Sequence, residues 1–258
     1  MFQRNITDEE FLNSFQAFGF AARSAISHLL SEKLRDDVSI KEDDVKAILL
    51  QTLENYYFQT EIVLMLIEAF HQKKLNSKKA LVAIYHKVFI KEGENGNYSE
   101  DLLNKIQGWN NQEFITYIGL KAPIELINKL PVEKIKELEK TFGSVDKAIA
   151  QGFDEIYNLK KSLESIISNR IGMKDGIKIP FFKMLNKLKH GYQVVEDETE
   201  NVLSLLIDLK EFTSENSTFE VIEIPIKKDT AYFYTDQIKN MAMSTRHLLH
   251  LYMLSNNC

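Results

Sequence analysis

The chain of 258 residues has one cysteine, four prolines, ten glycines and one tryptophan. Because the cysteine is the last residue, Cys258, an internal disulfide and a thiolate metal cage are excluded. No apolar run approaches the roughly 20 residues that a membrane-spanning helix needs, and no basic stretch followed by an apolar one opens the chain. These absences predict a cytoplasmic protein with no membrane partner, and the low glycine and proline content excludes collagen-like and low-complexity chains.

Positive charge is also scarce. Lys and Arg total 32 against 37 Asp and Glu, a formal net charge of −5, and the pI is near 5.8. A protein that grips nucleic acid over its whole surface is usually basic, because neutralising phosphates drives that binding. Any contact with nucleic acid is therefore expected from a local basic segment.

Helical periodicity dominates the first two thirds of the sequence. Capping boxes and apolar residues at three- and four-residue spacing predict a series of helices. They span residues 7–33, 40–71, 77–91, 99–107, 111–118, 123–130, a segment from 131 to Gly143, and 145–169. The long helix at 40–71 either crosses a bundle or breaks near Tyr56 and Tyr57. The predicted fold class is mainly α, a multi-helix bundle.

The residue pattern of the sequence changes after Arg170. A short helix is predicted from Pro180 to about His190, and two later runs, 202–209 and 219–226, are typical of a small antiparallel β-hairpin. A last helix follows, from residue 230 to about 253, with an apolar stripe that is either core or a subunit interface. We therefore expect a helical bundle over residues 1–170 and a second segment, 171–258, packed on the same body.

The stretch from Arg170 to His190 concentrates positive charge in this acidic chain, with six cations and one anion. On the helix predicted there, Lys183, Asn186, Lys187 and His190 share one face, and apolar side chains share the opposite face. Histidine can move a proton near neutral pH, and lysines can hold a phosphate. These residues fit a metal-free ribonuclease site, but also an ordinary solvated helix face, where cations near the C-terminus offset the helix dipole.

The run NKLKHG at 186–191 resembles segments of HEPN-type helical-bundle proteins, a superfamily rich in bacterial RNA-cutting toxins and abortive-infection proteins. The family motif has an Arg four to six residues before a His, often with Asn directly after the Arg. Asn186 and His190 match this form, whereas Leu185 stands in the Arg position and Lys183 is the cation on the face of His190. The resemblance implies an RNA-directed homodimer, in phage defence or a toxin–antitoxin pair, that cleaves RNA with no metal or other cofactor.

The resemblance also implies roles for single residues. The catalytic group would be His190, Lys183 and Asn186, and the phosphate-binding group would be Lys187, Arg170 and Lys189. The alternative is a non-enzymatic helical scaffold or regulatory protein that binds a protein partner through its late β-hairpin and its C-terminal helix. Whether the chain is an enzyme stays open between these two, and as an enzyme it would be a metal-independent endoribonuclease.

Two further groups carry potential metal ligands. Glu68 and His71 have the E-x-x-H spacing of di-iron bundles, but the chain holds no second copy. Arg246, His247 and His250 cluster on the last helix with no carboxylate or thiolate close in sequence. We interpret the first as a chance match and the second as a solvated or subunit-facing surface, with Arg246 as an alternative source of a guanidinium for the His190 site.

Overall fold

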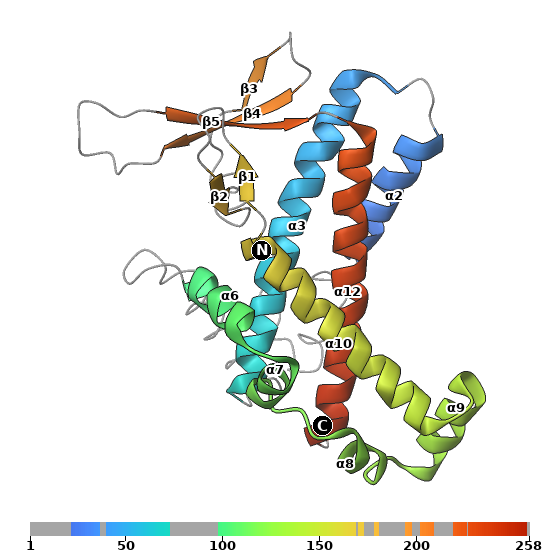
Figure 1. Ribbon diagram of the computed structural model, residues 1–258. Coiled ribbons are helices and arrows are strands. Elements are labelled where there is room, and N and C mark those ends of the chain that lie inside the picture. Colours follow the sequence, from blue (N-terminus) through green and yellow to red (C-terminus); the bar gives the residue numbers. More distant parts are fainter. Residues whose placement is uncertain are drawn as a thin grey trace, which may run out of the picture. The chain divides into compact units, whose positions relative to one another are not determined.

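The computed structural model describes residues 22–36, 40–72, 98–168, 170–172, 178–180, 194–197, 202–208, 219–225 and 227–256. This part of the chain is mainly helical (Figure 1), which confirms the predicted class. The helices are α2 (Ala22–Asp36), α3 (Glu42–His71), α6 (Tyr98–Gly108), α7 (Asn111–Tyr117), α8 (Pro123–Ile127), α9 (Val132–Phe142), α10 (Val145–Ser168) and α12 (Lys228–Asn256).

Helix ends follow their capping residues closely. Gly143 adopts the left-handed conformation, with φ of 80°, and ends α9. The Ser144 hydroxyl then accepts a hydrogen bond of 3.2 Å from the backbone N–H of Lys147, which begins α10 as the sequence predicts. Helix α8 is shorter than expected, because the backbone after Ile127 tightens into hydrogen bonds between residues three apart.

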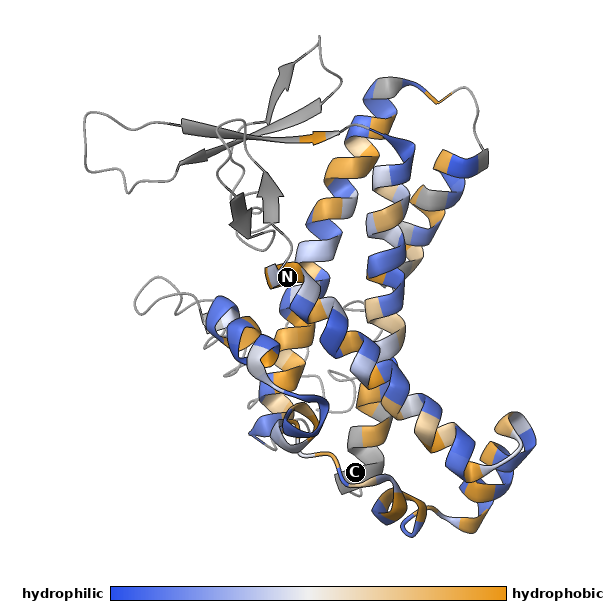
Figure 2. Cartoon of the chain, in the orientation of Figure 1, coloured by the Kyte–Doolittle hydropathy of each residue, from blue (hydrophilic) through white to orange (hydrophobic). Residues whose placement is uncertain are grey.

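Helix α3 is one continuous helix of 30 residues, so the alternative of a break near Tyr56 and Tyr57 is wrong. From Gln59 to Phe70 every residue of α3 except Ile62 is buried, and hydrophobic residues concentrate in this half of the helix in Figure 2. A helix segment that is buried nearly all round belongs to a core. Within the described ranges, no helix combines the length and apolar character that crossing a bilayer requires.

The strands within the described ranges are β1 (Arg170–Gly172), β2 (Lys178–Pro180), β3 (Val194–Asp197), β4 (Val202–Asp208) and β5 (Phe219–Pro225). Strands β1 and β2 pair antiparallel, with Arg170 opposite Pro180. The other three form an antiparallel sheet in the order β3-β4-β5, with Val202 opposite Pro225. Strand β5 is thus an edge strand, where a proline without an N–H is tolerated.

The prediction of a helix starting at Pro180 is wrong at its first residue. Pro180 ends strand β2, where its pairing with Arg170 holds the backbone extended. The rest of that predicted helix, the predicted helix at 77–91 and most of the one at 7–33 lie outside the described residues.

The described residues divide into two compact units. Unit 1 comprises those of Met1–Ala22, Thr60–Glu164 and Asn240–Cys258, and unit 2 comprises those of Arg23–Gln59 and Ser165–Lys239. Helices α3, α10 and α12 therefore contribute residues to both units. The division of the sequence into 1–170 and 171–258 stays a prediction.

The apolar stripe of α12 belongs to the core. Ile238, Met241, Thr245 and Leu248 are fully buried, so of the two readings of this stripe the structure supports core packing. In unit 2, the Tyr234 ring lies 5.9 Å from that of Tyr56, and burial raises the pKa of Tyr234 to about 12.

The contact between α10 and α12 in unit 1 gives a first testable prediction. A β-carbon at Gly152 would lie 3.1 Å from Leu251 Cδ1, closer than ordinary van der Waals contact. We expect Gly152→Leu to lower the free energy of unfolding by about 1–3 kcal/mol, because overpacking forces neighbouring side chains or backbone to shift. Denaturant titration measures the change.

Gly108 provides the matched control. No atom lies within 4 Å of a β-carbon built there, so Gly108→Leu should change the free energy of unfolding by less than about 0.5 kcal/mol. Equal stability of the two variants would contradict the described packing of α10 on α12.

Candidate functional site

The site predicted from the sequence lies almost entirely outside the described residues. This holds for Lys183, Asn186, Lys187, Lys189 and His190. Arg170, the sixth predicted site residue, is the first residue of β1. The arrangement of these side chains on one face of a helix therefore stays a prediction.

The histidine-bearing surface of α12 is described in part. The Arg246 side chain is exposed, and His247 Nδ1 lies 3.0 Å from the Met243 carbonyl oxygen, one turn earlier on the same helix. In the portion of the chain that the structure covers, no group of three or more His, Cys, Asp or Glu side chains is placed to hold a metal ion.

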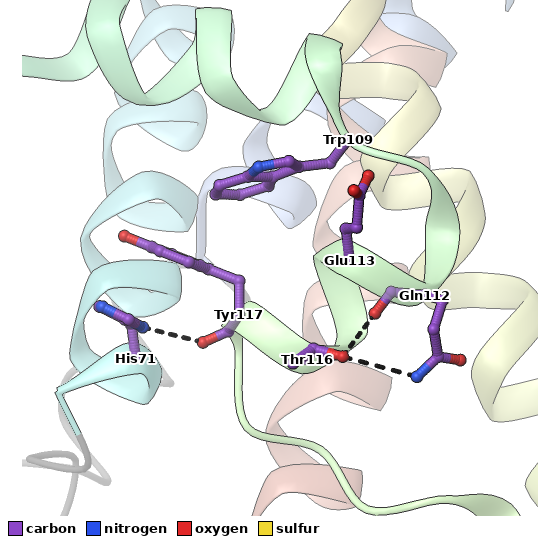
Figure 3. A pocket seen from close by; sticks show the side chains of 6 residues that line it. All are labelled: His71, Trp109, Gln112, Glu113, Thr116 and Tyr117. Atoms are coloured by element: carbon purple, nitrogen blue, oxygen red, sulfur yellow. Dashed lines mark hydrogen bonds between the residues drawn. The ribbon is translucent and has the colours of Figure 1, made fainter.

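The described residues form a different site, an open pocket of about 410 Å³ in unit 1, where α3 ends and α7 packs against it (Figure 3). Three of its side chains are aromatic rings and three are polar. The lining residues are His71, Trp109, Gln112, Glu113, Thr116 and Tyr117. We call this the aromatic pocket.

The turn between α6 and α7 positions Trp109 in the pocket. Its backbone N–H donates to the Ile106 carbonyl, 3.2 Å away. The next residue, Asn110, caps α7, where its side-chain oxygen accepts from the Glu113 N–H at 2.9 Å and the Glu113 carboxylate accepts from the Asn110 N–H at 2.7 Å. This capping box fixes where α7 begins, and with it the position of Glu113.

The three rings of the aromatic pocket form a stack. The centroid of the Tyr117 ring lies 3.9 Å from that of His71, with the planes within 6° of parallel. It lies 4.5 Å from the Trp109 ring, which is tilted by 36°, and Figure 3 shows Tyr117 between the other two. His71 Nδ1 is also 3.1 Å from the Tyr117 carbonyl oxygen. Because a carbonyl can only accept, Nδ1 carries the proton.

A buried carboxylate beneath the pocket holds Tyr117 in place. Glu68 is only 3% exposed, and its Oε2 accepts a hydrogen bond of 3.0 Å from the Tyr117 hydroxyl. Its Oε1 accepts from the Gln72 side-chain amide. These donors offset the cost of burying a charged group. Burial, followed by the charge of Glu68 and this hydrogen bond, raises the pKa of Tyr117, so the phenol stays protonated and keeps donating at neutral pH.

The pocket side of these residues is open to solvent. His71, Gln112, Glu113 and Thr116 are exposed, and Trp109 is partly exposed. The Thr116 hydroxyl donates to the Gln112 carbonyl at 2.8 Å. The six lining residues thus combine a rigid aromatic surface with one carboxylate, one amide and one hydroxyl, a combination suited to binding a flat polar ligand.

No pattern in the sequence indicated this pocket. Glu68 and His71 stood out only as a half-motif for metal, whereas both side chains contact Tyr117, which comes from another helix. The usable signal was the only tryptophan of the chain, placed directly before a capping box. A tryptophan in that position is fixed beside the start of a helix and is not part of an apolar stripe that packs in the core.

Comparison of the chain with protein-family models, with curated proteins and with solved structures finds no match.

The hydrogen bond between Tyr117 and Glu68 gives a second prediction. Tyr117→Phe should lower the free energy of unfolding at pH 7 by about 1–3 kcal/mol, because it removes a donor from a buried carboxylate. Denaturant titration measures this loss, with Tyr157→Phe on α10 as the control for removing a tyrosine hydroxyl.

The pH dependence has a defined sign. Because the folded pKa of Tyr117 lies above the ordinary value of 10.0, the folded state retains a proton that the unfolded state loses above about pH 10. The stabilisation from Tyr117 is complete below that pH and declines above it. The gap in unfolding free energy between the parent protein and Tyr117→Phe should therefore narrow from pH 9 to pH 11.5, and a gap that widens would contradict this account.

Proposed function

We propose that the protein is an RNA-directed, HEPN-like protein that acts as a metal-independent endoribonuclease in phage defence or in a toxin–antitoxin pair. The observation that carries the proposal is the segment 170–190, which holds six cations and one anion and ends at His190 in a chain of net charge −5. A local basic patch is what an acidic protein needs to hold RNA phosphates.

Two features support this function. The described part of the chain is mainly helical, as the HEPN resemblance of the segment 186–191 implies. The competing function is a scaffold that binds through its late β-hairpin and its last helix. On that helix, Ile238, Met241 and Leu248 of the apolar stripe are buried in the protein's own core, which leaves the stripe unavailable to a partner.

The proposed reaction uses acid–base chemistry on RNA. His190 takes the proton of a ribose 2′-hydroxyl, whose oxygen attacks the adjacent phosphorus, and the bond to the 5′-oxygen of the next nucleotide breaks. The leaving oxygen receives a proton from the second His190 of a homodimer. Lys183 supplies a positive charge to the phosphate, although as a point charge and not as the planar fork of an arginine, and Asn186 orients the reacting groups.

Lys187, Lys189 and Arg170 extend the basic surface along the RNA backbone in this proposal. Phosphate contacts of this kind position a nucleic acid without reading its sequence. Each therefore contributes to affinity and to its salt dependence more than to the choice of cleavage site.

The scaffold alternative retains one observation. Phe233 of α12 is 54% exposed in unit 2, and Met243 of α12 is 44% exposed in unit 1. Single exposed apolar side chains are common on proteins without partners. They are therefore weaker evidence for an interface on α12 than the burial of its apolar stripe is against one.

The third prediction tests the ribonuclease directly. His190→Ala should reduce RNA cleavage by about 10²- to 10⁴-fold, the usual contribution of a general acid–base residue, while the far-ultraviolet circular dichroism stays unchanged. A gel assay with purified protein and single-stranded RNA measures the rate, and a chelator should leave it unaffected.

His247→Ala is the matched control, since it removes a histidine of α12 that lies outside the segment 170–190. It should cleave at the parent rate. Parent protein that leaves RNA intact, or equal cleavage by the parent and His190→Ala, would contradict the ribonuclease function.

A further inference from the structure

We propose that the aromatic pocket is a binding site for an unpaired purine base, supplied by single-stranded RNA or by a free nucleotide. The site uses none of the residues assigned to RNA cleavage. It therefore goes beyond the proposed function and can be present in a protein that cuts no RNA.

The ring stack is built in advance of any ligand. The Tyr117 hydroxyl is held by Glu68 at 3.0 Å, and the His71 ring stacks on one face of the Tyr117 ring at a centroid distance of 3.9 Å. Trp109 completes the stack at 4.5 Å. Aromatic side chains that bind unpaired bases do so by stacking, and rings that are already fixed lose little freedom when the base arrives.

The rings of the aromatic pocket contrast with the buried aromatic side chains of the core. The large aromatic side chains Tyr57, Phe70 and Phe114 are fully buried and fill the core. His71 is exposed and Trp109 is partly exposed, yet both are ordered against Tyr117. An ordered aromatic surface open to solvent indicates a ligand more than a packing role.

The polar groups of the pocket favour a base over a phosphate. Glu113 is its acidic member, and no Lys or Arg is among the six described lining residues. A carboxylate repels phosphate but accepts hydrogen bonds from ring and exocyclic N–H groups, which adenine and guanine present on their edges. The Gln112 amide can both donate and accept at the same edge.

The size and shape of the pocket fit a base that remains attached to its sugar. A volume of about 410 Å³ falls within the range of small-molecule sites. Because the pocket is open, the ribose and phosphates can stay in solvent, away from Glu113. Purines are preferred over pyrimidines because their two fused rings give a larger stacking surface.

Trp109 makes the proposal directly measurable. It is the only tryptophan of the chain, so tryptophan emission of the full-length protein reports on this pocket alone. Titration with oligoadenylate and with adenosine monophosphate should quench the emission saturably. Oligouridylate should bind about tenfold more weakly, and inorganic phosphate should cause no change.

Two variants compare the same change of charge inside and outside the pocket. Glu113→Gln should weaken oligoadenylate binding about tenfold, because a neutral amide replaces the charged acceptor. Glu133→Gln makes the same change at an exposed residue in the first turn of α9, outside the six described lining residues, so it should bind within about threefold of the parent. Trp109→Ala, followed by anisotropy of a labelled oligoadenylate, should abolish binding while circular dichroism stays unchanged.

The outcomes also distinguish the source of the base. Oligoadenylate that binds more tightly than the mononucleotide indicates RNA, and equal affinities indicate a free nucleotide. The proposal is overturned if neither purine ligand quenches the emission saturably, or if oligouridylate binds as tightly as oligoadenylate. It is also overturned if tetramethylammonium quenches the emission and the purine ligands do not, because that result indicates a site for cations. His190→Ala should retain the quenching, so a failure of the ribonuclease and a failure of this site are separate results.

Discussion

The hydrogen bond from the Tyr117 hydroxyl to the Glu68 carboxylate is the interaction on which the aromatic pocket depends. It joins residues 49 positions apart, and it is made by a carboxylate that is 3% exposed. A buried charge without donors is costly, so the bond is specific for one placement of α7 on α3. That placement brings the Tyr117 ring onto His71 at 3.9 Å and, through the turn before α7, brings Trp109 onto Tyr117.

Two buried threonines of the long helices, in contrast to Glu68, are satisfied within their own helix. Thr52 donates to the Ile48 carbonyl at 2.7 Å, and Thr245 donates to that of Met241 at 2.6 Å. Such bonds to the preceding turn satisfy a hydroxyl without reference to any other helix. They keep α3 and α12 compatible with an apolar core, whereas only a long-range bond such as that of Glu68 selects a neighbour.

The sequence predicted the structural features that depend on residues close to one another along the chain. Gly143 marked the end of α9, and the apolar spacing along α3 indicated a long helix but left open a break near Tyr56 and Tyr57. Periodicity could not decide whether the stripe of α12 was core or interface, because both place the same residues on one face. It also could not reveal the aromatic pocket, since the spacing of Glu68 and His71 says only that they share a face. Their partner, Tyr117, is set by the packing of α7. Of the predicted site, only Arg170 lies among the described residues.

A double-mutant cycle on the free energy of unfolding, with Glu68→Gln, Tyr117→Phe and the combined variant, tests the central claim most directly. If the two side chains determine each other's placement, the cycle gives a coupling energy of about 1–3 kcal/mol. The emission of Trp109 should then shift in each single variant and shift no further in the double variant. Additive effects on unfolding, within about 0.5 kcal/mol, with unchanged Trp109 emission in both single variants, would contradict the account.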